Sequence, residues 1–177
     1  MIDFALNYFD LFGLPPRYRF DAAMLERSYR ELQSEVHPDR FAGGSDAQKR
    51  SALQSSARVN EAYRALRDPV LRARYVLKLH GIDALDETDT ALPLEFLERQ
   101  LERRETAGAA AEARDVRALS TLIAEIRDEG EDREAILAKL LDDDHDYRGA
   151  RMRVRELTFL HKLIADLDAM RAALDDE

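Results

Sequence analysis

The chain has 177 residues, 45% hydrophobic and 36% charged, and no apolar run approaches the 18 residues of a membrane-spanning helix, so the composition is typical of a soluble helical protein with a core. It contains no cysteine, which excludes disulfides, thiolate metal sites and a cysteine nucleophile. The net charge of −9 divides into +3 over residues 1–78 and −12 over residues 79–177, and so acidic a surface would repel a nucleic acid.

The N-terminal part of the chain predicts a short apolar segment followed by a helix. Residues 1–4 have no basic stretch before an apolar one, so we expect no signal peptide and a cytoplasmic protein. The apolar segment covers residues 8–15. Asp21 is a good N-cap, and the stripe that follows it predicts a helix that ends before Pro38: Leu25, Tyr29, Leu32 and Val36.

Two more helices are predicted before residue 82. A loop containing Gly43 and Gly44 leads into a second helix, expected over residues 46–67. Asp68 followed by Pro69 signals the start of a third helix, which we expect to stop at Gly81. Residues 1–81 thus form a first domain.

The second half of the chain predicts a bundle. Residues 82–92 are acidic and aperiodic, and we place a linker there. We then expect one helix that starts at Pro93 and a second over residues 109–128. A further helical segment follows a break near Glu129-Gly130, and the last helix covers residues 147–174, with leucines at heptad-like spacing. No strand-like alternation occurs. The sequence therefore predicts an all-α protein, in which a helical hairpin is followed by a three-helix-type bundle over residues 93–177.

The connection between the first two long helices contains His37, Pro38 and Asp39. Proline stiffens the loop, so less backbone entropy is lost on binding. The carboxylate of Asp39 suits pairing with an arginine of a partner, and His37 offers a ring donor and a ring acceptor. The simpler interpretation is a proline-terminated turn, with His37 capping the helix and Asp39 solvated.

The order of these elements resembles the J-domain, in which a tight helical hairpin presents an HPD loop to a DnaK-class chaperone. The resemblance implies that the loop and its flank dock on that chaperone and promote ATP hydrolysis in it: His37, Pro38, Asp39 and Arg40. The resemblance also implies that a basic face of the preceding helix takes part in docking, and here this face carries Arg27 and Arg30. Acidic neighbours dilute its positive charge: Glu26, Glu31 and Glu35.

The flanking segments are similar to those of one J-protein family, the HscB co-chaperones. Residues 8–15 (YFDLFGLP) look like the opening of these proteins, residues 37–41 (HPDRF) like their HPD loop and residues 72–81 (RARYVLKLHG) like the end of their J-domain. Other J-proteins more often continue into a Gly/Phe-rich linker and a cysteine-rich or β-rich domain. This chain continues directly into an acidic helical domain.

In the HscB family the C-terminal bundle binds an iron–sulfur scaffold of the IscU type, and residues 96–105 (FLERQLERRE) resemble its binding helix. The resemblance implies scaffold contacts by Leu97, Leu101, Glu102, Glu105 and Phe159. Helical spacing places these leucines and glutamates on adjoining parts of one side, as an apolar strip with an acidic border. Glu98 stands where the family often has an apolar residue. Without the resemblance, such leucines would be interpreted as bundle core.

An enzyme is not expected. The four histidines lie far apart and show no HExxH spacing, and no glycine-rich phosphate loop or GxSxG elbow occurs. We expect no metal, no cofactor, and no membrane or nucleic-acid partner. The predicted function is delivery of the scaffold to an HscA-type chaperone of the DnaK class and stimulation of its ATPase. A J-domain co-chaperone with general unfolded-protein clients, or a purely structural bundle, remains an alternative.

Overall fold

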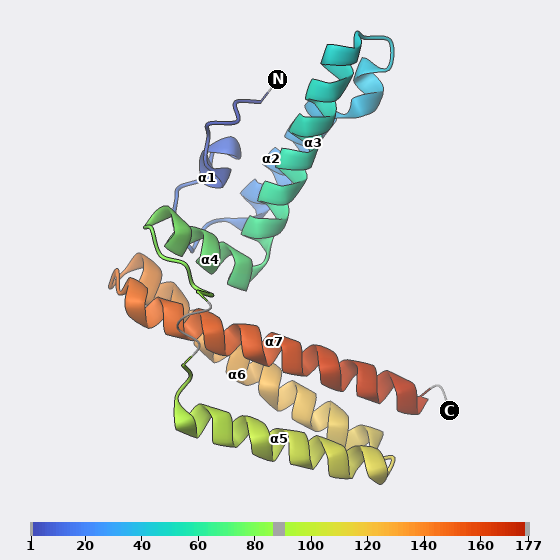
Figure 1. Cartoon of the computed structure of the whole chain (residues 1–177), viewed down its shortest axis with the longest axis vertical. Helices are drawn as coiled ribbons and strands as arrows, with labels where there is room; N and C mark the ends of the chain where they lie inside the picture. Colours follow the sequence, from blue (N-terminus) through green and yellow to red (C-terminus); the bar gives the residue numbers. More distant parts are fainter. Residues whose placement is uncertain (1, 87–90, 176–177) are drawn as a thin grey trace. The chain divides into compact units, whose positions relative to one another are not determined.

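The computed structural model describes residues 2–86 and 91–175, and the chain divides into two compact units, Met1–His80 and Gly81–Glu177. The first unit contains five helical elements: α1 (Tyr8–Leu11), α2 (Ala22–Val36), the 3-10 turn η1 (Pro38–Phe41), α3 (Asp46–Arg67) and α4 (Pro69–Leu79). The second contains α5 (Leu94–Glu112), α6 (Val116–Asp142) and α7 (Tyr147–Asp175) (Figure 1). No strand occurs among the described residues, and the all-α prediction is confirmed.

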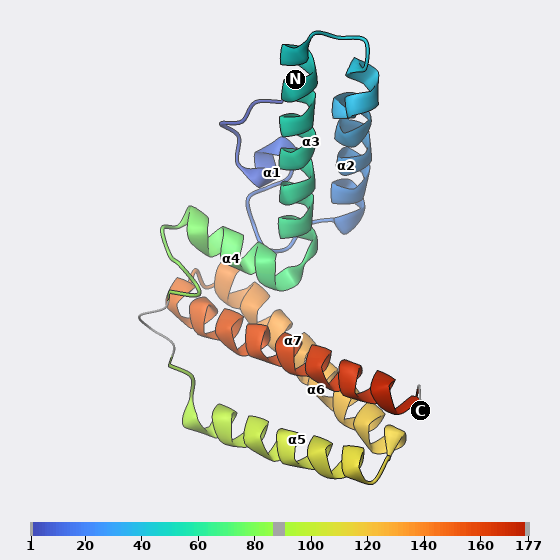
Figure 2. The ribbon, with the colours of Figure 1, turned by 45° about the vertical axis from the view of Figure 1, so that its right-hand side comes forward.

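In the first unit α2 and α3 lie side by side as a hairpin, a pairing visible in both Figure 1 and Figure 2. Their ends follow local signals. The Asp21 carboxylate accepts a hydrogen bond from the backbone N–H of Ala23 at 2.9 Å, and Ser45 and Gln48 form a reciprocal capping box at the start of α3. The bounds predicted for both helices are therefore confirmed.

Aromatic residues hold α1 against the rest of this unit. Phe9 is fully buried, and Tyr8 stacks on Tyr75 of α4 with ring centroids 4.1 Å apart. The Tyr8 hydroxyl donates to Glu61 of α3 at 2.7 Å, and the Arg58 guanidinium lies 4.5 Å from the centre of the Tyr8 ring. The predicted apolar segment thus braces α3 and α4.

The Tyr8 phenol provides a test of this bracing. Burial first, and then the hydrogen bond to Glu61, raise its pKa from the usual value to about 12. A pKa raised by folding contributes stability that is complete below the unfolded pKa of about 10 and is lost as the pH rises through the folded value. Titration of tyrosinate absorbance should show a transition near pH 12 that is absent from Tyr8→Phe. It should also be absent from the wild-type chain unfolded in urea. A transition that persists in Tyr8→Phe would belong to another tyrosine, and one that persists in urea would not arise from folding.

In the second unit α6 and α7 pack along most of their length, and α5 packs against both. The apolar core of this bundle draws on all three helices: Phe96, Ala107, Ala110, Leu119, Leu122, Ile123, Ile126, Leu160, Leu163 and Leu167. The bundle prediction is confirmed.

The predicted helix break near Glu129-Gly130 is wrong, because α6 runs through it without interruption. Gly130 is buried inside the helix. Glycine in a helix interior costs about 1 kcal/mol relative to alanine. The burial of Ile126 and Leu137 on either side of it outweighs this cost.

The predicted helix start near Ala109 is also wrong. Ala109 belongs to α5, which continues to Glu112. The turn lies at Arg114, which has a positive φ of 55°, and Asp115 then caps α6 by accepting from the N–H of Ala118 at 2.9 Å. An alanine-rich stretch favours a helix but does not show where one helix ends and the next begins.

The predicted linker, residues 82–92, lies partly outside the described residues, because 87–90 are not described. Residues 82–86 form no helix and belong to the second unit. Ala84 is buried, and its carbonyl accepts a hydrogen bond from Nε of Arg155 at 3.1 Å. This part of the segment is thus attached to α7.

Candidate functional site

The HPD loop lies at the tip of the α2–α3 hairpin (Figure 1). His37 ends α2 with extended backbone angles, as expected for a residue before proline, and Pro38 begins η1. The side chains of His37 and Asp39 are 49% and 90% exposed. Both are therefore accessible to another protein, whereas Val36 beside them is buried and anchors the loop.

Local hydrogen bonds hold the loop in one conformation. Nδ1 of His37 accepts from the backbone N–H of Asp39 at 3.3 Å and lies 3.6 Å from the Asp39 carboxylate. With Nδ1 as the acceptor, the neutral ring carries its proton on Nε2 and presents a donor there. Nη1 of Arg40 donates to the Ser34 carbonyl at 3.2 Å, which satisfies one of the free carbonyls at the end of α2. These contacts restrict the loop while its His37 and Asp39 side chains stay exposed.

Arg27 and Arg30 are exposed on α2. The carboxylate of Glu26 on the same helix accepts a hydrogen bond from the hydroxyl of Tyr63 at 2.5 Å. This bond, followed by burial, raises the pKa of Tyr63. Glu31 and Glu35 are exposed and Glu26 is partly buried, so acidic side chains accompany the two arginines of this helix, as the sequence predicts.

The second candidate surface lies on α5. Leu94, Leu97 and Leu101 are 70%, 41% and 60% exposed, so they do not belong to the bundle core. We call these three residues the leucine strip. The acidic candidates Glu102 and Glu105 are also exposed on α5. The predicted site residues of this helix therefore gather on its outward side.

Phe159 lies at the edge between core and surface. Its ring meets Phe96 of α5 edge-on, with centroids 5.7 Å apart, and the Arg104 guanidinium lies 5.4 Å from its centre. Phe159 is partly buried and packs against the bundle core, so it supports α5 as well as contributing to the surface. It also lines a shallow groove of about 250 Å³, together with residues that the sequence did not single out: Leu85, Asp86, Leu92, Arg155, Thr158 and Lys162.

The groove residues were missed because they come from two distant segments. Thr158 and Lys162 are close to Phe159 on α7, so helical spacing could have identified them. Leu85 and Leu92 lie in the aperiodic segment, which carries no pattern of its own.

The described part of the chain shows no group of three or more histidine, aspartate or glutamate side chains able to hold a metal ion. None of the helices over residues 2–86 and 91–175 combines the length and hydropathy that a membrane span requires. The two candidate surfaces are thus the exposed HPD loop of the first unit and the exposed leucine strip of the second.

Comparison with known proteins agrees with both units. Residues 7–75 match the DnaJ domain, and residues 92–168 match the HSCB C-terminal oligomerisation domain. The co-chaperone protein HscB homolog of Burkholderia mallei (strain SAVP1) is 46% identical over 175 residues, covering 99% of both chains. The structure of chaperone HscB from Vibrio cholerae is similar with a TM-score of 0.82 at 32% identity, covering 96% of this chain and 99% of that one.

Human co-chaperone protein HscB is also similar in structure, with a TM-score of 0.86 at 27% identity over 95% of this chain and 83% of the human chain. The relatives therefore match nearly the whole length of the chain, including its acidic second unit. The exposed HPD loop, the helical bundle and these matches together show that the chain belongs to the HscB family of J-domain co-chaperones, which serve iron–sulfur cluster assembly.

Proposed function

We propose that this chain is a cytoplasmic, non-enzymatic adaptor that brings an IscU-type iron–sulfur scaffold to an HscA-type chaperone and stimulates the ATPase of that chaperone. The observation that carries the proposal is that each unit exposes one preorganised docking element. These are the HPD loop in the first unit and the leucine strip with its acidic border in the second.

The HPD loop supports the chaperone contact through its chemistry. The Asp39 carboxylate is almost fully exposed and suits a bidentate pair with an arginine of the partner. His37 supplies a donor on Nε2, and the restricted backbone of Pro38 lowers the entropy lost on docking. Arg27 and Arg30 add positive charge, which speeds the encounter with an acidic partner surface more than it raises affinity.

The α5 surface supports the scaffold contact. Three leucines exposed on one helix are unfavourable in water, and their contiguity suits a partner that covers them. Glu102 and Glu105 beside them select basic groups on that partner. Leu97, Leu101 and Phe159 supply the apolar anchors in this proposal, and Glu98 adds a carboxylate to the border.

Because both surfaces belong to one chain, binding of the scaffold is coupled to engagement of the chaperone. A scaffold held on α5 experiences a raised effective concentration of the chaperone that the HPD loop has engaged, without any new contact between them. Hydrolysis takes place in the chaperone, which then closes on the scaffold as its client.

A single-turnover ATPase assay tests this proposal. This chain alone should accelerate hydrolysis by the HscA-type chaperone, and adding the IscU-type scaffold should accelerate it further. The chain alone should accelerate hydrolysis in either case. If an unfolded, unrelated client then adds as much acceleration as the scaffold does, the result would support a J-protein with general clients instead. No acceleration by the chain in any combination would exclude the proposal.

A further inference from the structure

The helix α5 has two faces that could be buried against α6 and α7. The face that is buried carries Phe96, Gln100, Ala107 and Ala110, whereas the leucine strip is exposed. At 100° per residue the two faces are separated by roughly a third of a turn. Three leucines bury more apolar area than one phenylalanine and two alanines, so hydrophobic burial alone would favour turning the strip inward.

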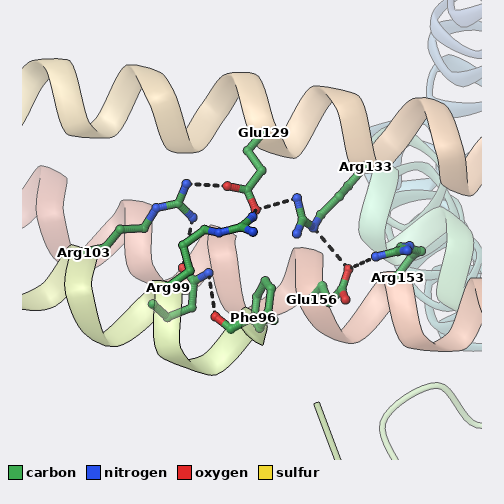
Figure 3. Close-up of polar contacts among 8 residues, drawn as sticks. Phe96, Arg99, Arg103, Glu129, Arg133, Arg153 and Glu156 are labelled. Atoms are coloured by element: carbon green, nitrogen blue, oxygen red, sulfur yellow. Dashed lines mark hydrogen bonds and ion pairs between the residues drawn. The ribbon is translucent and has the colours of Figure 1, made fainter. Parts of the chain in front are cut away.

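A network of charged side chains opposes this rotation (Figure 3). Arg103 of α5 forms an ion pair with Glu129 of α6, and Arg99 lies 3.6 Å from the same carboxylate. Arg133, one turn further along α6, pairs with Glu129 at 2.5 Å. Arg103, Glu129 and Arg133 have side chains only 13–15% exposed, so these charges are largely removed from water.

The same network connects to the buried face of α5 and to α7. The amide of Gln100, which is 2% exposed, accepts from Arg103 at 3.2 Å and donates to the Phe96 carbonyl at 3.2 Å. The Arg133 guanidinium lies 5.4 Å from the centre of the Phe96 ring. Nε of Arg133 donates to Glu156 of α7 at 3.1 Å, and that carboxylate is also paired with Arg153 at 2.6 Å (Figure 3).

The ion pairs of Arg99 and Arg103 with Glu129 depend on which face of α5 is turned inward, whereas the hydrogen bonds of Gln100 lie within α5. Rotation of α5 by a third of a turn would carry Arg99 and Arg103 away from Glu129 and leave this largely buried carboxylate with Arg133 as its remaining partner. An unpaired buried charge is strongly unfavourable, whereas a buried polar network that is fully paired can select one arrangement out of several. Ala107 and Ala110 allow α5 to lie close to the neighbouring helices, but they bury too little apolar area to determine which face of α5 is turned inward.

We propose that the network of Arg103, Glu129 and Arg133 is a rotational lock that keeps the leucine strip of α5 exposed. These are positioning residues: they act on the strip through the orientation of α5 and need not touch a partner. The lock itself is a property of this chain, and only its consequence for scaffold binding rests on the proposed function.

The test uses thiol labelling, because the chain contains no cysteine. Leu101→Cys places a single reporter on the strip, and Ala107→Cys places one on the buried face. Each is made in the wild-type chain and in the triple variant Arg103→Ala/Glu129→Ala/Arg133→Ala, which removes the three charges without adding large apolar side chains to the inward face, while Glu156 keeps Arg153 as its partner. Circular dichroism checks that the variants remain helical.

In the wild-type background the reporter at position 101 should react quickly and the one at position 107 slowly. In the triple variant labelling at 101 should slow by about tenfold and labelling at 107 should become faster, because a buried thiol reacts only when the helix opens locally. The matched control is Arg127→Met/Asp168→Leu, which removes an ion pair of 2.7 Å between α6 and α7 that does not involve α5. It should leave both rates unchanged.

Equal labelling rates in the wild-type and triple-variant backgrounds would overturn the lock. If the triple variant loses its helices, Arg133→Lys replaces it; this change keeps the charge but removes the planar fork that reaches two carboxylates. Slower labelling at 101 is again expected, by about threefold, and an unchanged rate would again overturn the lock.

Scaffold binding is then measured by calorimetry on the same chains without the reporters. Affinity should fall in the triple variant in parallel with labelling at 101. If the wild-type chain does not bind the scaffold at all, the proposed function fails while the labelling result still decides the lock. If labelling changes as expected but affinity does not, the lock has no role in binding.

Discussion

Replacing His37 by glutamine should abolish stimulation of the partner ATPase while leaving the fold and scaffold binding intact. Glutamine also carries an acceptor and a donor, but its flexible amide does not hold them at the fixed separation of the ring, whose Nδ1 accepts from the Asp39 N–H at 3.3 Å while Nε2 presents a donor. The side chain is half exposed and buries no core contact, so the free energy of unfolding should change by less than about 0.5 kcal/mol. Single-turnover hydrolysis and chemical denaturation measure the two effects.

Two further variants separate docking from general damage. Asp39→Asn keeps the shape but removes the charge that pairs with an arginine, and docking should weaken by roughly 30-fold, which corresponds to about 2 kcal/mol. His161→Gln makes the same exchange at an exposed position of α7 and should stimulate like the wild type. Full stimulation by His37→Gln would show that the loop is not the docking element.

Replacing Leu97 and Leu101 together by alanine should weaken scaffold binding by at least roughly 30-fold, about 2 kcal/mol, because central apolar anchors carry most of the energy of an interface. Both side chains are exposed in the free chain, and alanine favours the helix, so the fold should lose no stability. Stimulation of the chaperone in the absence of scaffold should be unchanged. Calorimetry with the scaffold and thermal unfolding are the measurements.

Ile136→Ala is the matched control for the loss of an exposed apolar side chain. Ile136 is 45% exposed on α6, in the same unit but outside the proposed surface. Its replacement should leave scaffold affinity within about twofold of the wild type. Equal losses for Ile136→Ala and for the double leucine variant would mean that binding follows the general apolar surface of the bundle and not the strip. A change in self-association of the double variant would instead assign the strip to contacts between copies.

The sequence alone determined those elements whose signals are local. Asp21 and Asp68-Pro69 place two helix starts of the first unit, because a cap satisfies the free N–H groups of the first turn through side chains only two or three residues away. The HPD loop was equally predictable, since proline fixes the backbone at the point where the hairpin turns.

Tertiary structure decided what depends on contacts distant in sequence. Gly130 was expected to interrupt a helix, yet α6 continues through it because its apolar stripe is buried on both sides of the glycine. The helical spacing of the leucine strip in α5 was compatible with either a buried or an exposed position. The face that is exposed follows from Arg103, Glu129 and Arg133 meeting across two helices, a contact that no window of sequence contains.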